Sequence, residues 1–158
     1  LIGICWRSAF SEPVPFIYAK LDELISSLPE GDYCLVNLQY GDFTADIVRI
    51  ESELGVKIHE VPDLNQLEDL DGVAALISCL DLVIAPSSSV LHLSCALGVP
   101  TISTYYPNFR SDARTDPLFG NCLPVLKPDD VFYSSVVAER TGIATRHFLK
   151  FGELPFKN

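Results

Sequence analysis

Short apolar runs alternate with amphipathic stretches along most of the chain. The apolar runs, most of which begin or end at a polar or turn-forming residue, predict buried strands at residues 1–6, 33–38, 56–61, 81–85, 100–105 and 123–126. The stretches between them repeat apolar residues every three or four positions, and predict helices at residues 16–28, 42–54, 69–80, 88–97 and 128–140.

Capping residues mark several of these helix ends. Pro29 ends the first helix, and Gly55 and Gly98 follow the second and fourth, where a left-handed residue commonly closes a helix. Asp69 or Asp71 can cap the third helix at its start. The alternation of strands and helices therefore has local support at the helix boundaries.

Strands that alternate with helices predict an α/β domain with a parallel sheet. We expect a single Rossmann-like domain over residues 1–158, with about six strands in doubly wound order and helices on both faces. Ligands of such sheets bind beyond the carboxyl ends of the strands. That rule selects four segments, at residues 6–8, 38–41, 86–89 and 105–107.

Composition removes several classes of function. The net charge of −10 leaves no basic footprint for a nucleic acid or an anionic membrane surface. No apolar run approaches the roughly 18 residues of a membrane helix, so we expect no transmembrane segment. The five cysteines include no C-x-x-C pair, which argues against a zinc site and favours a reduced, cytoplasmic protein. The chain has no Met and begins in a strand-like run, so we expect it to be a piece of a longer protein.

The Ser turn, residues 86–89, is the strongest candidate for chemistry. It lies between a buried strand and a helix, and it carries Ser87, Ser88 and Ser89. The first turn of a helix has unpaired N–H groups and a dipole that favours negative charge. Small hydroxyl residues there suit a diphosphate, whereas the plainer interpretation is a single serine N-cap.

His92 lies one helical turn after Ser88 and can donate to a phosphate or a ribose. The alternative is a histidine satisfied within the core. Arg7 and Ser8 follow the first strand, and Arg7 is either a phosphate ligand or half of a surface ion pair. Gln39 follows the second strand, where it can read a base or sugar edge or simply form a turn.

Two further segments carry charge. Acidic residues of one loop could form a carboxylate pair for glycoside hydrolysis, but capping and solubility explain them more simply: Asp63, Glu68, Asp69 and Asp71. Arg110 and Arg114 lie in a long irregular segment, residues 106–122, that is typical of a mobile lid.

In these segments the chain resembles the C-terminal domain of glycosyltransferase family nine, the heptosyltransferase-like enzymes, in versions attached to tetratricopeptide repeats. The resemblance rests on ordered elements within residues 1–105: residues 3–8, 36–41, 70–77, 80–84 and 88–100.

The resemblance implies a GT-B architecture of two facing Rossmann-like domains, of which this one binds the nucleoside-diphosphate sugar. It implies hexosyl or heptosyl transfer without a metal or other cofactor, and a missing N-terminal domain that binds the acceptor. Ser88, Ser89 and His92 match the helix-start motif of the family.

Two departures from the family stand out. Ser87 occupies the position of an Asp that is expected to contact or orient the donor, and residues 108–111 stand where a Trp-Arg-Trp-like segment is usual. The first departure motivates a second hypothesis, a non-catalytic binding or interaction module on a degenerate glycosyltransferase scaffold. A nucleotide-sugar epimerase is a third, for which no acid–base residues can be assigned.

Overall fold

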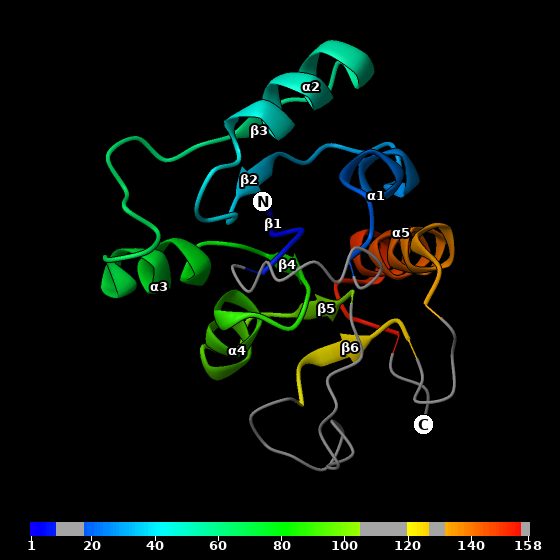
Figure 1. Cartoon of the computed structure of the whole chain (residues 1–158). Helices are drawn as coiled ribbons and strands as arrows, with labels where there is room; N and C mark the ends of the chain where they lie inside the picture. Colours follow the sequence, from blue (N-terminus) through cyan, green and yellow to red (C-terminus); the bar gives the residue numbers. More distant parts are fainter. Residues whose placement is uncertain (9–17, 105–119, 127–131, 156–158) are drawn as a thin grey trace.

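The chain forms a parallel sheet with helices on both faces (Figure 1). The computed structural model describes residues 1–8, 18–104, 120–126 and 132–155. The strands are β1 (Ile2–Ile4), β2 (Leu35–Asn37), β3 (Ile58–His59), β4 (Leu82–Ala85), β5 (Thr101–Ser103) and β6 (Cys122–Pro124). The helices are α1 (Leu21–Ser27), α2 (Thr44–Leu54), α3 (Leu70–Ser78), α4 (Ser89–Ala96) and α5 (Ser134–Phe151).

The sheet has the doubly wound order β3-β2-β1-β4-β5-β6, and every neighbouring pair is parallel. The chain first builds outward from β1 to β3, then returns to pair β4 with the other side of β1. Ile2 is opposite Leu82 and Ile4 is opposite Ile84 in this pairing. The predicted fold class is confirmed, and the switch point of the sheet lies between β1 and β4.

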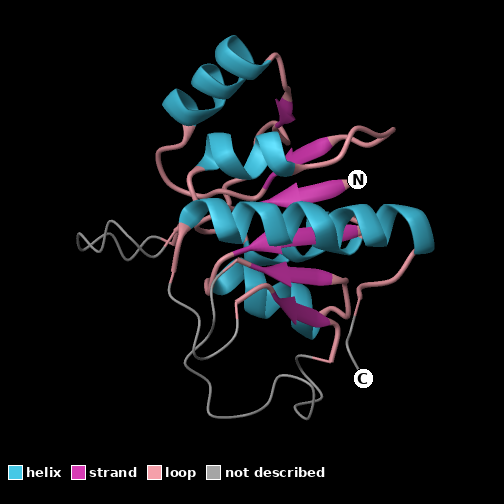
Figure 2. Cartoon of the chain, turned by 90° about the vertical axis from the view of Figure 1, so that its right-hand side faces the viewer, coloured by secondary structure: helices cyan, strands magenta, loops and turns pink. Residues whose placement is uncertain are grey.

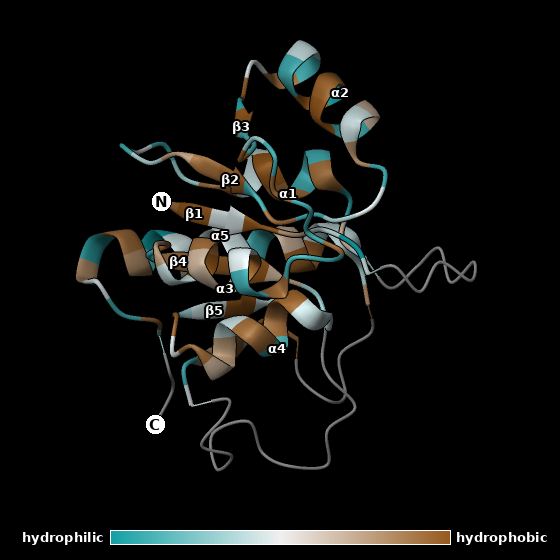
Figure 3. Cartoon of the chain, turned by 90° about the vertical axis from the view of Figure 1, so that its left-hand side faces the viewer, coloured by the Kyte–Doolittle hydropathy of each residue, from teal (hydrophilic) through white to brown (hydrophobic). Residues whose placement is uncertain are grey.

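Two cores lie on opposite faces of the sheet, because successive strand residues point to opposite sides. On β4, Leu82 and Ile84 join a core with α1, α2 and α5, whereas Val83 and Ala85 join one with α3 and α4. All four are fully buried. Figure 3 shows the matching concentration of hydrophobic residues on the strands and on the helix sides that face them.

The elements differ from prediction mainly at their ends. The strands are shorter than the apolar runs, and α2 begins at Thr44 rather than Asp42. Gly55 closes α2 in the left-handed region, with φ 67°, and the Asp69 carboxylate caps α3 by accepting from the Gly72 N–H at 2.8 Å, both as predicted.

The last helix does not end near Arg140 as predicted. It continues through Gly142 to Phe151 and runs across the sheet beside α1 (Figure 2). A glycine within a helix ordinarily lowers its stability. Here a Cβ at position 142 would overlap the carbonyl oxygen of Ser27, so glycine permits the close approach of α1 and α5.

Some sequence predictions fall outside the described residues. These are the switch-point segment 105–107, the lid with Arg110 and Arg114, the segment 108–111 and the predicted helix start at residues 128–130.

Candidate functional site

The carboxyl ends of β1, β2 and β4 bring together the segments that the sequence selected. Cys5, Gln39 and Pro86 each lie within two residues of the end of one of these strands. Because β1 lies between β2 and β4, the three segments meet around the switch point. In a doubly wound sheet this is where ligands bind.

The Ser turn opens α4 as the sequence predicts. Ser88 is the N-cap, with extended backbone, and its hydroxyl accepts from the Leu91 N–H at 3.4 Å. The first backbone bond of the helix runs from the His92 N–H to the Ser88 carbonyl. The N–H groups of Ser89 and Val90 therefore precede the helical ladder and can donate to an outside anion.

The other two serines of the turn keep their hydroxyls unengaged. Ser88 is 6% exposed, whereas Ser87 is half-buried and Ser89 is exposed. Among the described residues, neither the Ser87 nor the Ser89 hydroxyl makes a hydrogen bond. The plain N-cap interpretation thus accounts for Ser88 and leaves two hydroxyls next to the helix N-terminus.

His92 lies on the same side of α4 as Ser88. Its ring nitrogen Nδ1 is 2.7 Å from the Ser88 carbonyl oxygen. A carbonyl oxygen can only accept, so Nδ1 carries the hydrogen in this contact. His92 is exposed, which removes the alternative of a histidine buried in the core.

Gln39 is enclosed by protein and braces two loops. The side chain is 1% exposed. Its amide oxygen accepts from the backbone N–H groups of Trp6 at 3.0 Å and Arg7 at 2.9 Å, and its amide nitrogen donates to the Tyr40 carbonyl at 3.0 Å. The structure therefore places Gln39 behind the site, as a link between loops.

Arg7 is half of an ion pair. Its guanidinium contacts the Asp46 carboxylate and the Asp42 carbonyl oxygen, and lies 5.9 Å from the centre of the Trp6 ring. The Asp46 carboxylate also accepts from the Trp6 indole N–H at 3.0 Å. Sequence reasoning missed Asp46, although an acidic residue in the first turn of a helix is a recognisable signal.

Cys5 is the second residue that sequence reasoning missed, because it was interpreted only as a small core residue. It is fully buried, and its thiol lies 3.5 Å from the Gln39 amide oxygen and 3.4 Å from the Arg7 carbonyl oxygen. Burial raises the pKa of this thiol to about 12, against smaller opposing effects that include hydrogen bonds to Arg7 and Ser88. Cys5 therefore stays protonated at neutral pH and joins the loop after β1 to the Ser turn.

A cavity of about 350 Å³ lies next to this network, at the carboxyl ends of β2 and β3. Its lining includes Asn37, Tyr40 and Phe43, from the end of β2 and the segment after it, and Leu64 and Gln66 from the loop after β3. The Gln66 side chain donates to the Asn37 carbonyl at 3.1 Å, while its amide oxygen is buried and has no hydrogen-bond partner in the described part of the chain. Ser8 lies nearby, where its hydroxyl accepts from the Tyr40 hydroxyl at 3.4 Å.

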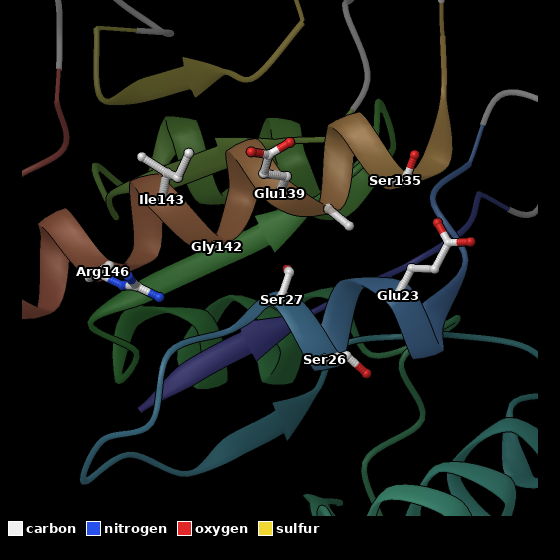
Figure 4. Close-up of a pocket in the computed structure, with 9 residues that line it drawn as sticks. Glu23, Ser26, Ser27, Ser135, Glu139, Gly142, Ile143 and Arg146 are labelled. Carbon is white, nitrogen blue, oxygen red and sulfur yellow. The ribbon is translucent and has the colours of Figure 1, made fainter.

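A larger hollow, about 430 Å³, lies between α1 and α5 (Figure 4). Its lining mixes small residues, such as Ser27 and Gly142, with the charged groups Glu23, Glu139 and Arg146. It lies away from the switch point, and the polar loop segments do not reach it. We therefore place the candidate site at the strand ends, despite the larger volume of this groove.

Three further observations bound the chemistry. The described residues contain no cluster of three or more His, Cys, Asp or Glu side chains that could hold a metal ion. Within the same residues, no helix combines the length and the apolar character required to cross a bilayer. All five cysteines are free thiols.

Comparison with known proteins connects this site to one enzyme family. The sequence model of Glycosyltransferase family 9 (heptosyltransferase) matches residues 64–122, which contain α3, β4, the Ser turn and α4. Protein FlbA of Caulobacter vibrioides is 45% identical over 65 residues, covering 41% of this chain and 11% of that protein.

The structure of E. coli ADP-heptose LPS heptosyltransferase II aligns with a TM-score of 0.67 and 20% identity, over 94% of this chain and 46% of that one. At this identity the alignment shows a shared fold. The chain thus spans less than half the length of either relative. Residues 64–122 thus match the model of Glycosyltransferase family 9, and the domain has the fold of the heptosyltransferase.

Proposed function

We propose that this chain is the nucleotide-sugar-binding domain of a metal-independent GT-B glycosyltransferase, and that the Ser turn holds the donor diphosphate. The observation that carries the proposal is the start of α4 at the switch point. There the N–H groups of Ser89 and Val90 lie at the start of the helix, and Ser87 and Ser89 flank the N-cap Ser88 in the chain. Such a terminus attracts phosphate through both its donors and its dipole.

The relatives indicate the class of substrate. The name of the E. coli heptosyltransferase gives ADP-heptose as its donor. A nucleoside-diphosphate sugar is accordingly the ligand class that we propose here. The acceptor and the catalytic base belong, in this proposal, to an N-terminal domain outside residues 1–158. Free cysteines support the expected cytoplasmic location.

In the same proposal, the cavity at the ends of β2 and β3 accommodates the nucleoside of the donor. It begins two strand spacings from β4, about 10 Å, so a diphosphate on the Ser turn would leave its nucleoside near this cavity. Tyr40, Phe43 and Leu64 offer apolar contact to a planar base. The unpaired Gln66 amide oxygen offers an acceptor to a base amino group or a ribose hydroxyl.

Calorimetric titration with ADP, GDP and UDP tests the proposal. We expect one of the three to bind, and Ser89→Asp to weaken that binding at least tenfold, because a carboxylate there repels the diphosphate. Ser135→Asp is the matched control, since Ser135 is an exposed serine in the first turn of α5. Both variants should fold equally well, because acidic residues favour a helix N-terminus. Absence of binding by all three nucleotides would overturn the proposal.

A second candidate function is a non-catalytic binding module, favoured by Ser87 at the position where the family usually has Asp. The two candidates differ in catalysis, so the informative protein is the full-length parent. If its transfer activity is absent and Ser87→Asp creates it, the module interpretation holds. Ordinary transfer by the unmodified parent would exclude it.

A further inference from the structure

Two consecutive backbone N–H groups at the end of β1 converge on one side-chain oxygen. The N–H of Trp6 and that of Arg7 both donate to the Gln39 amide oxygen, at 3.0 and 2.9 Å. Consecutive N–H groups that converge in this way are typical of anion sites. In this chain the protein supplies the acceptor itself, so these two donors serve to fix the β1 loop, residues 5–8.

Gln39 is held rigidly enough to do this. The Asn37 side chain accepts from the Gln39 N–H at 2.8 Å, and its amide nitrogen lies 3.3 Å from the Gln39 carbonyl oxygen. Asn37 is fully buried, and Gln39 donates onward to Tyr40. Turning the Gln39 amide out toward a ligand would leave the Trp6 and Arg7 N–H groups without their acceptor, which is unfavourable for buried donors.

Resting on the function proposed above, we propose that Gln39 is a positioning residue of the donor site: it holds the β1 loop, which carries Arg7, at the end of β1, next to the strand β4 that leads into the Ser turn. Arg7 is the basic residue of that loop, with its side chain 37% exposed. Cys5, buried between Gln39 and Ser88, couples the two segments. Gln39 acts on the ligand through Arg7 and makes no contact with it.

A double-mutant cycle tests whether Gln39 acts through Arg7. The wild type, Gln39→Leu, Arg7→Ala and the double variant are each titrated with ADP, GDP and UDP. We expect each single change to weaken the tightest nucleotide about tenfold, and Gln39→Leu to add nothing once Arg7 is absent. Losses that multiply in the double variant, or an unchanged affinity in Gln39→Leu, would overturn the proposal. If Gln39→Leu does not fold, Gln39→Met, of similar length, takes its place in the cycle.

Asn121→Leu is the structural control. The Asn121 amide also braces two segments, by donating to the Val99 carbonyl, but it does so just before β5 and β6, at the opposite end of the sheet. It should lower the free energy of unfolding and leave nucleotide affinity unchanged.

A second readout needs no ligand, because Trp6, the single tryptophan of the chain, lies in the β1 loop and is 5% exposed. Gln39→Leu should shift its emission to the red and increase its quenching by acrylamide, whereas Asn121→Leu should not. If no nucleotide binds, the proposed function fails while the fluorescence still shows whether Gln39 holds the loop. Unchanged Trp6 fluorescence in both Gln39 variants would exclude positioning of the β1 loop by this side chain.

Discussion

The Ser turn and the β1 loop lie beside each other at the ends of β4 and β1, yet their polar groups are used in opposite ways. In the β1 loop, the backbone N–H groups of Trp6 and Arg7 are taken by Gln39, and the side chains of both residues bind Asp46. In the Ser turn, one serine caps the helix while the hydroxyls of Ser87 and Ser89 have no partner among the described residues.

The difference separates two kinds of polar residue at a strand end. Groups that bind one another build the scaffold, so their loss should lower stability, and in our proposal it reaches the ligand only through the exposed part of Arg7. Groups that the protein leaves unpaired at the surface should influence stability little and ligand binding more. Each substitution below changes one group, and its effects on stability and on nucleotide affinity show to which of the two kinds the group belongs.

The largest effect on stability is expected from Asp46→Ala. The substitution removes the acceptor of the buried Trp6 indole N–H, the ion pair with the half-exposed Arg7 and an acidic residue of the first turn of α2. Together these should lower the free energy of unfolding by about 2–4 kcal/mol. Urea denaturation followed by Trp6 fluorescence measures it.

The neighbouring Asp42→Ala is the control. Asp42 binds Arg7 through its backbone carbonyl, which the substitution keeps, and its side chain is exposed. Its effect should stay within about 0.5 kcal/mol. Equal losses in the two variants would show that the loop is not held through the Asp46 carboxylate.

Ser88 combines both roles, because it caps α4 and also lies in the proposed diphosphate site. Ser88→Ala removes the N-cap of α4 and should lower the free energy of unfolding by about 1 kcal/mol. Ser88→Asp keeps a capping acceptor and most of this stability, but brings a negative charge to the proposed diphosphate site. Nucleotide affinity should therefore fall further in Ser88→Asp than in Ser88→Ala, while stability ranks the other way.

The cap of α3 provides the control for this pair. Asp69→Ala removes an N-cap that likewise accepts from the N–H three residues later, at the start of a different helix. It should reduce stability as Ser88→Ala does and leave nucleotide affinity unchanged. An equal loss of affinity in Asp69→Ala would mean that affinity merely follows stability.

The fold could be predicted from the sequence because its signals are local. Continuous apolar runs such as residues 81–85 identify strands buried on both faces, and the serines before α4 identify a helix start. The length of α5 could not be predicted in this way. Gly142 is a helix breaker by local propensity, and only the backbone of Ser27, over a hundred positions earlier, explains its place within the helix.

The candidate site, like the fold, could be predicted only where its signals are local in the sequence. The N-cap at Ser88 was recognisable because a cap is defined by its neighbours in sequence, whereas its contact with a donor stays a prediction. The role of Gln39 depends on its contacts with Trp6 and Arg7. The partner of Arg7 is Asp46, which lies 39 positions later in the chain. A sequence shows that such residues are polar and lie near strand ends, but not which of them bind each other.

Unpaired hydroxyls in the core provide the next test of the difference between paired and unpaired polar groups. Thr141 and Thr145 are fully buried on α5, and their hydroxyls have no hydrogen-bond partner within the ranges that the structure describes. Folding removes water from such hydroxyls without giving them a new hydrogen bond. Thr145→Val should therefore raise the free energy of unfolding by roughly 0.5–1 kcal/mol. Thermal denaturation should show no gain for Thr44→Val, whose hydroxyl is at the surface.

The smallest effect on stability is expected for a serine of the proposed diphosphate site. Ser89→Ala removes a hydroxyl that is exposed, so its hydration in the free protein makes it nearly neutral for folding, within about 0.5 kcal/mol. The same change removes one donor from the proposed diphosphate site and should weaken nucleotide binding several-fold. A variant that binds as tightly as the wild type would leave the backbone N–H groups of α4 as the anion site and assign the exposed serine no part in it.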